Sequence, residues 1–306
     1  MAKILVTGGT VFVSKFTAAY FVARGHEVWV LNRNTRPQVP GVHLIAGDRH
    51  DLGGKLKEHC FDAVLDICAY TQADVRQLVQ ALGKFGTYLL ISSSAVYPQT
   101  LPRPFREDQP CGPNCVWGAY GTNKLEAENW LLENVPGAYI LRPPYIYGPM
   151  QNVYREGFVF DCARQGRVFC LPGDGKLPLQ FFHVEDLCRF MEILLEKKPS
   201  QRVFNVGNPE TVTARQWVKL CYDAVGAEMA SVSITDHPQR SYFPFHDYDY
   251  ALDVSAQMRL MPRVKDLGEG LRESWQWYRD NPEAVVRKPL LTYIDREIFR
   301  KEQGMK

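Results

Sequence analysis

Short apolar runs alternate with helical patterns from the start of the chain, and this order constrains the fold more than any other feature. Residues 3–7 have the pattern of a buried strand, a glycine turn follows, and residues 14–24 have helical spacing before Gly25. A strand, a helix and a second strand in this order give parallel pairing. The sequence predicts an α/β fold with a parallel sheet covered on both faces. Further strand patterns lie at 28–31, 43–46, 63–67, 88–91 and 138–141, and helical patterns at 71–82 and 118–133.

The alternation becomes irregular after Pro149, where glycine, proline and aromatic residues are mixed. We therefore expect a nucleotide-binding domain at 1–148, to which 181–206 return, and a smaller mixed substrate domain at 149–180 and 207–286. Residues 287–306 contain apolar side chains at helical spacing and are expected to form a docked C-terminal helix.

Composition excludes several classes of protein. The chain has 306 residues, 45% of them hydrophobic, and 36 basic against 34 acidic residues give a net charge of +2. This balance provides no field for attracting nucleic acid or a membrane surface. No apolar run approaches the length of a membrane span, and no signal peptide is recognised, so we expect a cytoplasmic protein with reduced cysteines and no metal site. Cys111 and Cys115 miss the usual zinc spacing and are interpreted as structural, with a redox role as the alternative.

The turn after the first strand has the character of a dinucleotide site, which needs bare backbone amides that face a pyrophosphate at a helix N-terminus. Gly8 and Gly9 fit this need, whereas Val11 and Ser14 replace the later glycines of the usual spacing. A plain strand-to-helix turn is the alternative. With this turn the predicted sheet becomes a Rossmann-type, doubly wound one. The candidate cofactor residues here are Gly8, Gly9, Thr10, Val11, Phe12 and Val13.

The end of the second strand bears on which nucleotide is bound. No acidic residue stands where one would hold a ribose 2′-hydroxyl; Arg33 and Arg36 follow Asn32 instead. Arginines can meet a 2′-phosphate, so the cofactor is NADP or NAD, with NADP favoured over the alternative of two solvated arginines. Asp48 and Arg49, after the third strand, are candidates to flank an adenine, although the pair is also an ordinary turn.

A tyrosine and a lysine are candidates for proton transfer. Tyr120 is the only one of fifteen tyrosines with a lysine four residues later, at Lys124, and a helix would place both side chains on one face. The pKa of a free phenol is about 10, so a tyrosine that acts as a general base near neutral pH needs a pKa lowered by about 3 units. An adjacent positive charge can lower it in this way.

The remaining motifs follow in a fixed order along the chain. They are Thr7-Gly8-Gly9, Asp48, Ile91-Ser92-Ser93-Ser94-Ala95-Val96-Tyr97, Tyr120 with Lys124, Leu141-Arg142-Pro143 through Tyr147-Gly148-Pro149, and Phe182-His183-Val184-Glu185-Asp186.

In this order the motifs resemble the extended short-chain dehydrogenases/reductases, the NAD-dependent epimerase/dehydratase family, from residue 3 to about 280. Together with the non-glycine residue at 11, the 142–148 segment is similar to a divergent branch that includes chloroplast stem-loop RNA-binding proteins. The resemblance implies that Tyr120 is the acid/base, that Lys124 holds the nicotinamide ribose and lowers the phenol pKa, and that Ser93 orients the substrate oxygen. It also implies that Cys68, Ala69 and Pro143 line the cofactor.

Departures from the family pattern limit the function. Ser94 and Ala95 stand where sugar-nucleotide 4,6-dehydratases carry an Asp-Glu pair, which disfavours dehydration. Tyr145 and Gln180 replace an asparagine and an arginine that are common in sugar-nucleotide enzymes. We therefore expect an NAD(P)-dependent oxidoreductase or epimerase that acts on a hydroxyl or keto carbon of a small molecule, for which a nucleotide sugar is a candidate. A homodimer through helices that include the Tyr120 helix also fits the resemblance. The alternative is a binding or regulatory protein, including an RNA-binding one, with a vestigial active site.

Two further features have more than one interpretation. His183 is expected to anchor the turn before a helix near Glu185 rather than to perform chemistry. The aromatic run 242–250 is compatible both with the lining of a substrate pocket and with a packed loop.

Overall fold

The computed structural model describes residues 1–299, and the chain divides into two compact units. The first unit contains 1–146, 182–209 and 252–264, and the second contains 147–181, 210–251 and the described residues from 265 to 299. Part of the predicted tail helix, 300–306, lies outside the described residues.

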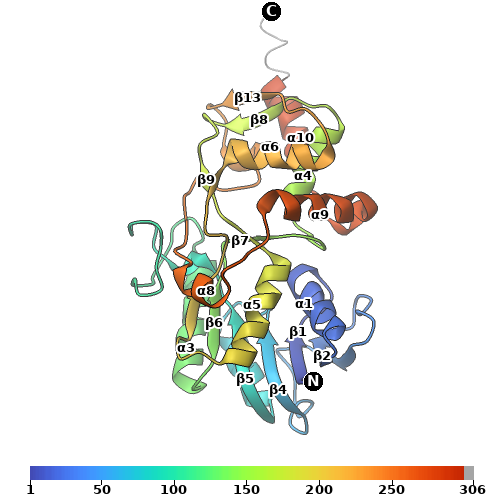
Figure 1. The fold of residues 1–306 in the computed structure, drawn as a ribbon, viewed down its shortest axis with the longest axis vertical. Coiled ribbons are helices and arrows are strands. Elements are labelled where there is room, and N and C mark those ends of the chain that lie inside the picture. The colour runs from blue at the N-terminus through green and yellow to red at the C-terminus, as the bar shows by residue number, and fades with distance from the viewer. Residues whose placement is uncertain (300–306) are drawn as a thin grey trace, which may run out of the picture. The chain divides into compact units, whose positions relative to one another are not determined.

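The first unit is built on a seven-stranded sheet with the order β11-β6-β5-β4-β1-β2-β3, and all its assigned pairings are parallel (Figure 1). The predicted Rossmann-type, doubly wound sheet is confirmed. Its strands are β1 (Lys3–Thr7), β2 (Glu27–Asn32), β3 (His43–Ala46), β4 (Cys60–Asp66), β5 (Lys84–Ile91), β6 (Tyr139–Arg142) and β11 (Val203–Asn205).

Helices cover both faces of this sheet, because its strands are apolar on both sides. On one face α1 (Phe12–Ala23) and α5 (Val184–Lys197) pack together, and Phe21 and Phe190 enter the core with Val6 and Val30. On the other face α2 (Gln72–Ala81) and α3 (Ala119–Asn134) pack together over a separate core. A short 3-10 helix, η1 (Ser94–Val96), follows β5.

Residues 252–264 pack with the first unit, whereas the sequence pattern placed them with the substrate domain. The segment contains α8 (Ser255–Leu260). The Asp253 backbone N–H donates to the Phe105 carbonyl at 2.8 Å. The side-chain oxygen of Gln257 accepts from the Gly207 backbone N–H, and its side-chain nitrogen donates to the Gly207 carbonyl. Hydrogen bonds of this kind leave no periodic pattern, so the return of the segment was not predicted.

The second unit is a mixed assembly around α4 (Glu156–Arg164), α6 (Ala214–Val225) and α9 (Leu267–Asp280), which pack against one another (Figure 1). Its core is aromatic: the Trp217 ring stacks on Phe181 and meets Phe245 edge-on at 4.9 Å. Phe243 and Phe245 are fully buried, so this part of the aromatic run is packed core. The shorter elements of the unit are parallel strands β8 (Phe169–Pro172) and β13 (Ser231–Ile234), antiparallel strands β9 (Pro178–Leu179) and β12 (Val212–Thr213), α7 (Gln239–Tyr242) and η2 (Pro282–Ala284).

The C-terminal part of the described chain is helical, with α10 (Leu290–Tyr293) followed by a π-helical turn, η3 (Ile294–Ile298). Leu290, Ile294 and Ile298 are buried, as their helical spacing predicted.

Two further strands, β7 (Tyr145–Tyr147) and β10 (Phe181–His183), form a small sheet of their own. Among residues 1–299, no helix is both long and apolar enough to cross a membrane.

Candidate functional site

A pocket of about 660 Å³ lies in the first unit at the carboxyl ends of β1, β2, β3 and β4. The strand order reverses direction between β4 and β1, and ligands of doubly wound sheets bind at such a switch point. The sequence-predicted residues Gly8, Thr10, Val11, Asn32, Arg33, Arg36, Asp48, Arg49 and Cys68 all line this pocket, together with Thr7, Leu31, Thr35, Gly47, His50, Tyr70, Thr71 and Asp74.

The glycine turn leaves no space for side chains. Gly8 and Gly9 both have φ of 89°, which favours glycine. A Cβ atom on Gly8 would lie 2.7 Å from Cys68 Sγ and from Ser14 Oγ, and one on Gly9 would lie 2.6 Å from a Val30 methyl group. The turn therefore brings bare backbone to the pocket, as a pyrophosphate requires.

The substitution of Val11 does not strain the turn. Val11 has an extended backbone, with φ of −137° and ψ of 135°, which a branched residue adopts readily. The unusual conformation falls on Phe12, which has φ of 33° and begins α1. No side chain caps this helix, so its first N–H groups stay available to an anion. Val13 follows Phe12 within the first turn.

Asn32 ties the second strand to the glycine turn. Its side-chain amide donates to the Gly8 carbonyl at 2.6 Å and to Gln38 Oε1 at 3.0 Å, and its oxygen accepts from the Asn34 backbone N–H at 2.9 Å. Asn32 thus shapes the pocket through the backbone. Sequence reasoning missed Gln38, since no motif marks a residue that acts through its neighbours.

Arg33 and Arg36 lie exposed at the pocket wall. Within the described part of the chain, neither guanidinium forms an ion pair or a side-chain hydrogen bond. Both positive charges are therefore available to an anionic ligand.

Arg49 is fixed by carboxylates. Its guanidinium donates to both oxygens of Asp66 at 3.2 and 3.1 Å, and its Nε lies 3.6 Å from Asp74. Asp66 is fully buried and also accepts from Thr7 and Tyr88 at 2.8 and 2.7 Å. The network joins the last residues of β1 and β4 to the loop after β3, so Arg49 shapes the pocket wall in addition to lining it.

The neighbouring residues at these strand ends have local partners. Asp48 accepts from the His50 backbone N–H at 2.9 Å, which is an ordinary turn contact. Cys68 Sγ lies 3.4 Å from the Thr7 carbonyl, and burial raises the pKa of its thiol. Cys68 is therefore a packed neutral thiol at neutral pH.

Lys124 is buried in the first unit, with 2% of its surface exposed. Its Nζ donates to the carbonyl of Ala69 at 2.6 Å and to that of Ile91 at 2.8 Å, which links α3 to the ends of β4 and β5. Burial lowers the pKa of Lys124 from 10.5 to about 8. The amine is thus positioned with two donors occupied and a third left for a ligand.

Tyr120 is the second residue of the same helix, and 36% of its surface is exposed. Burial raises the pKa of its phenol, and a hydrogen bond with Ser93 lowers it by less. The expectation that Lys124 lowers this pKa is wrong for the protein alone, because Lys124 is held by carbonyls and its Nζ lies 5.9 Å from the Tyr120 ring centroid. Ser93 Oγ also accepts from the Ala95 backbone N–H at 3.2 Å.

A buried ion pair anchors the helix that carries both residues. Arg142, at the end of β6, donates from Nε to Glu128 at 3.1 Å and from a terminal nitrogen at 2.6 Å. Its other terminal nitrogen donates to the Tyr97 hydroxyl at 2.8 Å, and that hydroxyl donates to Asn205 at 2.8 Å. The network connects α3, β6, β11 and the segment after β5. Next to it, the Pro143 carbonyl accepts from the Ser94 backbone N–H at 3.0 Å.

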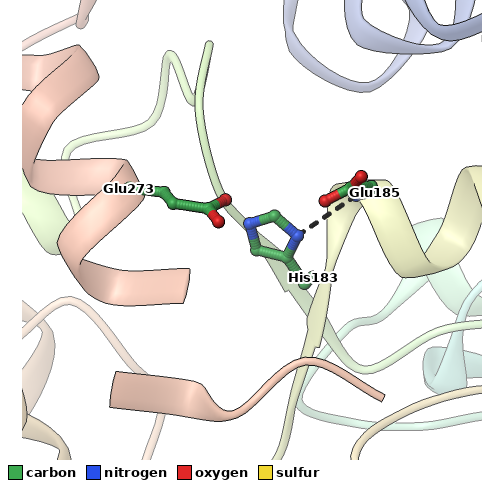
Figure 2. A group of neighbouring side chains, drawn as sticks. All are labelled: His183, Glu185 and Glu273. Atoms are coloured by element: carbon green, nitrogen blue, oxygen red, sulfur yellow. Dashed lines mark hydrogen bonds between the residues drawn. The ribbon is translucent and has the colours of Figure 1, made fainter. Parts of the chain in front are cut away.

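His183 is the N-cap of α5, and Figure 2 shows its ring beside the start of that helix. Its Nδ1 accepts from the Glu185 backbone N–H at 3.3 Å. The structural role expected for His183 is confirmed. Elsewhere in the first unit, Cys111 and Cys115 are both free thiols rather than a disulfide.

Comparisons with known proteins agree with this geometry. The NAD dependent epimerase/dehydratase family matches residues 4–207. A chloroplast stem-loop binding protein of 41 kDa from Arabidopsis thaliana is 30% identical, over 89% of this chain and 78% of its own length. A dTDP-glucose 4,6-dehydratase of Streptomyces griseus is 25% identical, over 83% of this chain and 79% of its own.

Solved structures share the fold. UDP-glucose 4-epimerase from Thermotoga maritima aligns with a TM-score of 0.76 at 19% identity, covering 92% of this chain and 99% of its own. The dTDP-glucose 4,6-dehydratase of Bacillus anthracis aligns with a TM-score of 0.74 at 21% identity, covering 95% and 100%. The glycine turn, the uncapped helix and the pocket at the switch point fit a dinucleotide. The chain belongs to the NAD-dependent epimerase/dehydratase family of extended short-chain dehydrogenases/reductases.

Proposed function

We propose that the protein is an NAD(P)-dependent oxidoreductase or epimerase that acts on a hydroxyl or keto carbon, with Tyr120 as the acid/base. One observation carries the proposal: a single unit contains both a pocket beside a glycine turn at the switch point of the sheet and a Tyr120–Lys124 pair on one helix. A protein that only binds nucleotide has no evident need for the second.

The side chains have separable roles in this proposal. When bound, the nicotinamide exchanges a hydride with the substrate carbon. The raised pKa keeps the Tyr120 phenol protonated at neutral pH, so it suits proton donation to a keto oxygen. Ser93 orients that oxygen through its hydroxyl. Lys124 uses its remaining N–H to hold a ribose hydroxyl, while the Ala69 and Ile91 carbonyls fix its position.

A nucleotide sugar is the proposed substrate class. Relatives and structural neighbours are named for UDP-glucose and dTDP-glucose, and several of those structures were solved with NAD. Ser94 and Ala95 provide no carboxyl group for water elimination. We therefore favour epimerisation or reduction over 4,6-dehydration.

The cofactor preference is proposed to be for NADP. Arg33 and Arg36 are exposed at the pocket wall without ion-pair partners in the described chain, and a 2′-phosphate would supply one. Arg33→Ala is expected to reduce NADPH affinity at least tenfold and to leave NADH affinity unchanged, on the scale of one charge-assisted phosphate contact of about 1.5–3 kcal/mol.

Titration with NADH and NADPH, followed by tryptophan-to-nicotinamide energy transfer, tests this proposal. Arg76→Ala is the matched control, because Arg76 is exposed on α2 outside the pocket. Turnover is then assayed with UDP-glucose, dTDP-glucose and their 4-keto derivatives. Failure of both nucleotides to bind at millimolar concentration would refute the enzyme proposal, and an unchanged NADPH/NADH ratio in Arg33→Ala would refute the cofactor preference.

A second candidate function is binding of a nucleic-acid stem-loop, for which RNA is the candidate, because the Arabidopsis thaliana relative is a stem-loop binding protein. The near-neutral net charge counts against it. Fluorescence anisotropy with a labelled stem-loop RNA, repeated in the presence of NADPH, distinguishes the two. Submicromolar RNA binding without nucleotide binding would favour the second candidate.

A further inference from the structure

The burial of Lys124 raises a question about access to the proposed ribose contact. With 2% of its surface exposed, the side chain has almost no contact with solvent. Two of its N–H groups already donate to carbonyls. A ribose hydroxyl can reach the third only if a side chain that covers Nζ moves.

Two aromatic rings lie over this ammonium. The Tyr70 ring centroid is 5.1 Å from Lys124 Nζ, and the Tyr120 ring centroid is 5.9 Å away. The two rings are neighbours, with centroids 6.3 Å apart. Both distances to Nζ lie within cation–π range, so the rings take the place of a ligand at Lys124.

The two rings differ in freedom. Tyr120 is part of α3, interacts with Ser93, and packs against Trp117 with centroids 6.0 Å apart. Tyr70 is 58% exposed, and its hydroxyl forms no hydrogen bond with any residue of the described chain. Only its backbone is held, since its N–H donates to Asp74 at 2.8 Å. Tyr70 can therefore rotate about its side-chain bonds without a change in the loop.

Tyr70 also lies at the edge of the pocket. It lines the pocket, whereas Lys124, Tyr120 and Ser93 do not. A ligand that fills only the adenosine half stays on the pocket side of this ring. A full dinucleotide must extend past the ring to reach Lys124.

We propose that Tyr70 is a gate between the two halves of the dinucleotide site, and that its ring must leave Lys124 before the nicotinamide ribose can bind there. The inference rests on the proposed function. In the free protein the ring competes with the ligand for the ammonium. The apparent affinity for the full dinucleotide is therefore the intrinsic affinity multiplied by the fraction of molecules in which the gate is open. The adenosine half binds independently of the gate.

Calorimetric titration of Tyr70→Ala and Tyr70→Phe with NADPH and with 2′,5′-ADP tests the gate. We expect Tyr70→Ala to bind NADPH roughly two- to fivefold more tightly, which is the scale of one exposed cation–π contact, with unchanged affinity for 2′,5′-ADP. Tyr70→Phe keeps the ring and should match the wild type for both ligands. Leu132→Ala, at an exposed position of α3 outside the pocket, is the control and should change neither affinity.

Each other result overturns the gate. Weaker or unchanged NADPH binding by Tyr70→Ala would show that the ring stabilises the bound state or takes no part. Equal changes for both ligands would indicate a general effect on the pocket, and a Tyr70→Phe variant that behaves like Tyr70→Ala would assign the effect to the hydroxyl. If the wild type binds neither NADPH nor NADH, the proposed function fails as well, which separates that failure from failure of the gate alone.

Discussion

Removal of one charge from the buried Glu128–Arg142 pair tests how the Tyr120 helix is held. The side chains are 1% and 6% exposed, and Glu128→Gln keeps the size of the side chain while it removes the charge. Arg142 stays charged, since a guanidinium does not lose its proton in proteins. Breaking a buried pair from one side costs about 3–5 kcal/mol, because the remaining charge has no counter-ion. For a unit of this size that corresponds to a fall in melting temperature of roughly 6–20 °C.

Thermal and urea unfolding followed by circular dichroism measure this loss. Glu126→Gln is the matched control, because Glu126 is exposed on the same helix two residues away. The double variant Glu128→Met/Arg142→Met should recover most of the stability, since it buries no unpaired charge. If Glu128→Gln unfolds within about 0.5 kcal/mol of Glu126→Gln, the ion pair is not what anchors α3 and the reasoning fails.

Further outcomes are expected at three residues, Tyr120, Lys124 and Gly9. Tyr120→Phe should lower turnover at least a hundredfold and leave NADPH affinity within about twofold, as steady-state kinetics and titration measure; retained activity would contradict its role as acid/base. Cofactor affinity should fall as pH rises through about 8, the pKa of Lys124, and titrations of Lys124→Met across pH should show no such step. The pKa of Lys124 is about 8 in the folded protein and 10.5 in its ordinary state, so between pH 8 and 10.5 the unfolded chain binds more protons than the folded one. The thermal stability of the wild type relative to Lys124→Met should therefore rise as the pH increases from about 8 to 10.5. Gly9→Ala should abolish nucleotide binding, since its Cβ would lie 2.6 Å from a Val30 methyl group at φ of 89°; normal binding in a titration would show that the turn tolerates a side chain.

The sequence predicted the sheet well because buried parallel strands are continuous apolar runs. Each predicted strand from 3–7 to 138–141 overlaps an observed strand. Many of the residues that line the pocket lie directly after these strands, so their positions could be predicted from the strand ends. The glycine turn was predicted for the same reason, since a short apolar strand followed by two glycines has few other uses.

Long-range polar contacts were beyond prediction. Arg49 and Asp66 bond each other across 17 residues of sequence, and Tyr97 and Asn205 do so across 108 residues. No periodic pattern in the sequence links the members of either pair. The direction of the Tyr120 pKa shift was missed because it depends on burial, which sequence spacing does not report. Val11 stands where the usual spacing has a glycine, yet the positive φ lies one residue later, at Phe12, which the motif does not indicate.

The division of the first unit into three stretches of sequence has a consequence for synthesis on the ribosome. The ribosome completes β6 at Arg142 well before it makes the edge strand β11, which contains Asn205, the hydrogen-bond partner of Tyr97. The segment 252–264 is made later still. At about 5–20 residues per second, synthesis of the chain between Arg142 and Asn205, where β11 ends and β6 gains its partner strand, takes roughly 3–13 seconds. During that interval the nascent sheet exposes the unpaired backbone of β6 along its edge, which is a surface that chaperones bind and that other nascent chains can pair with.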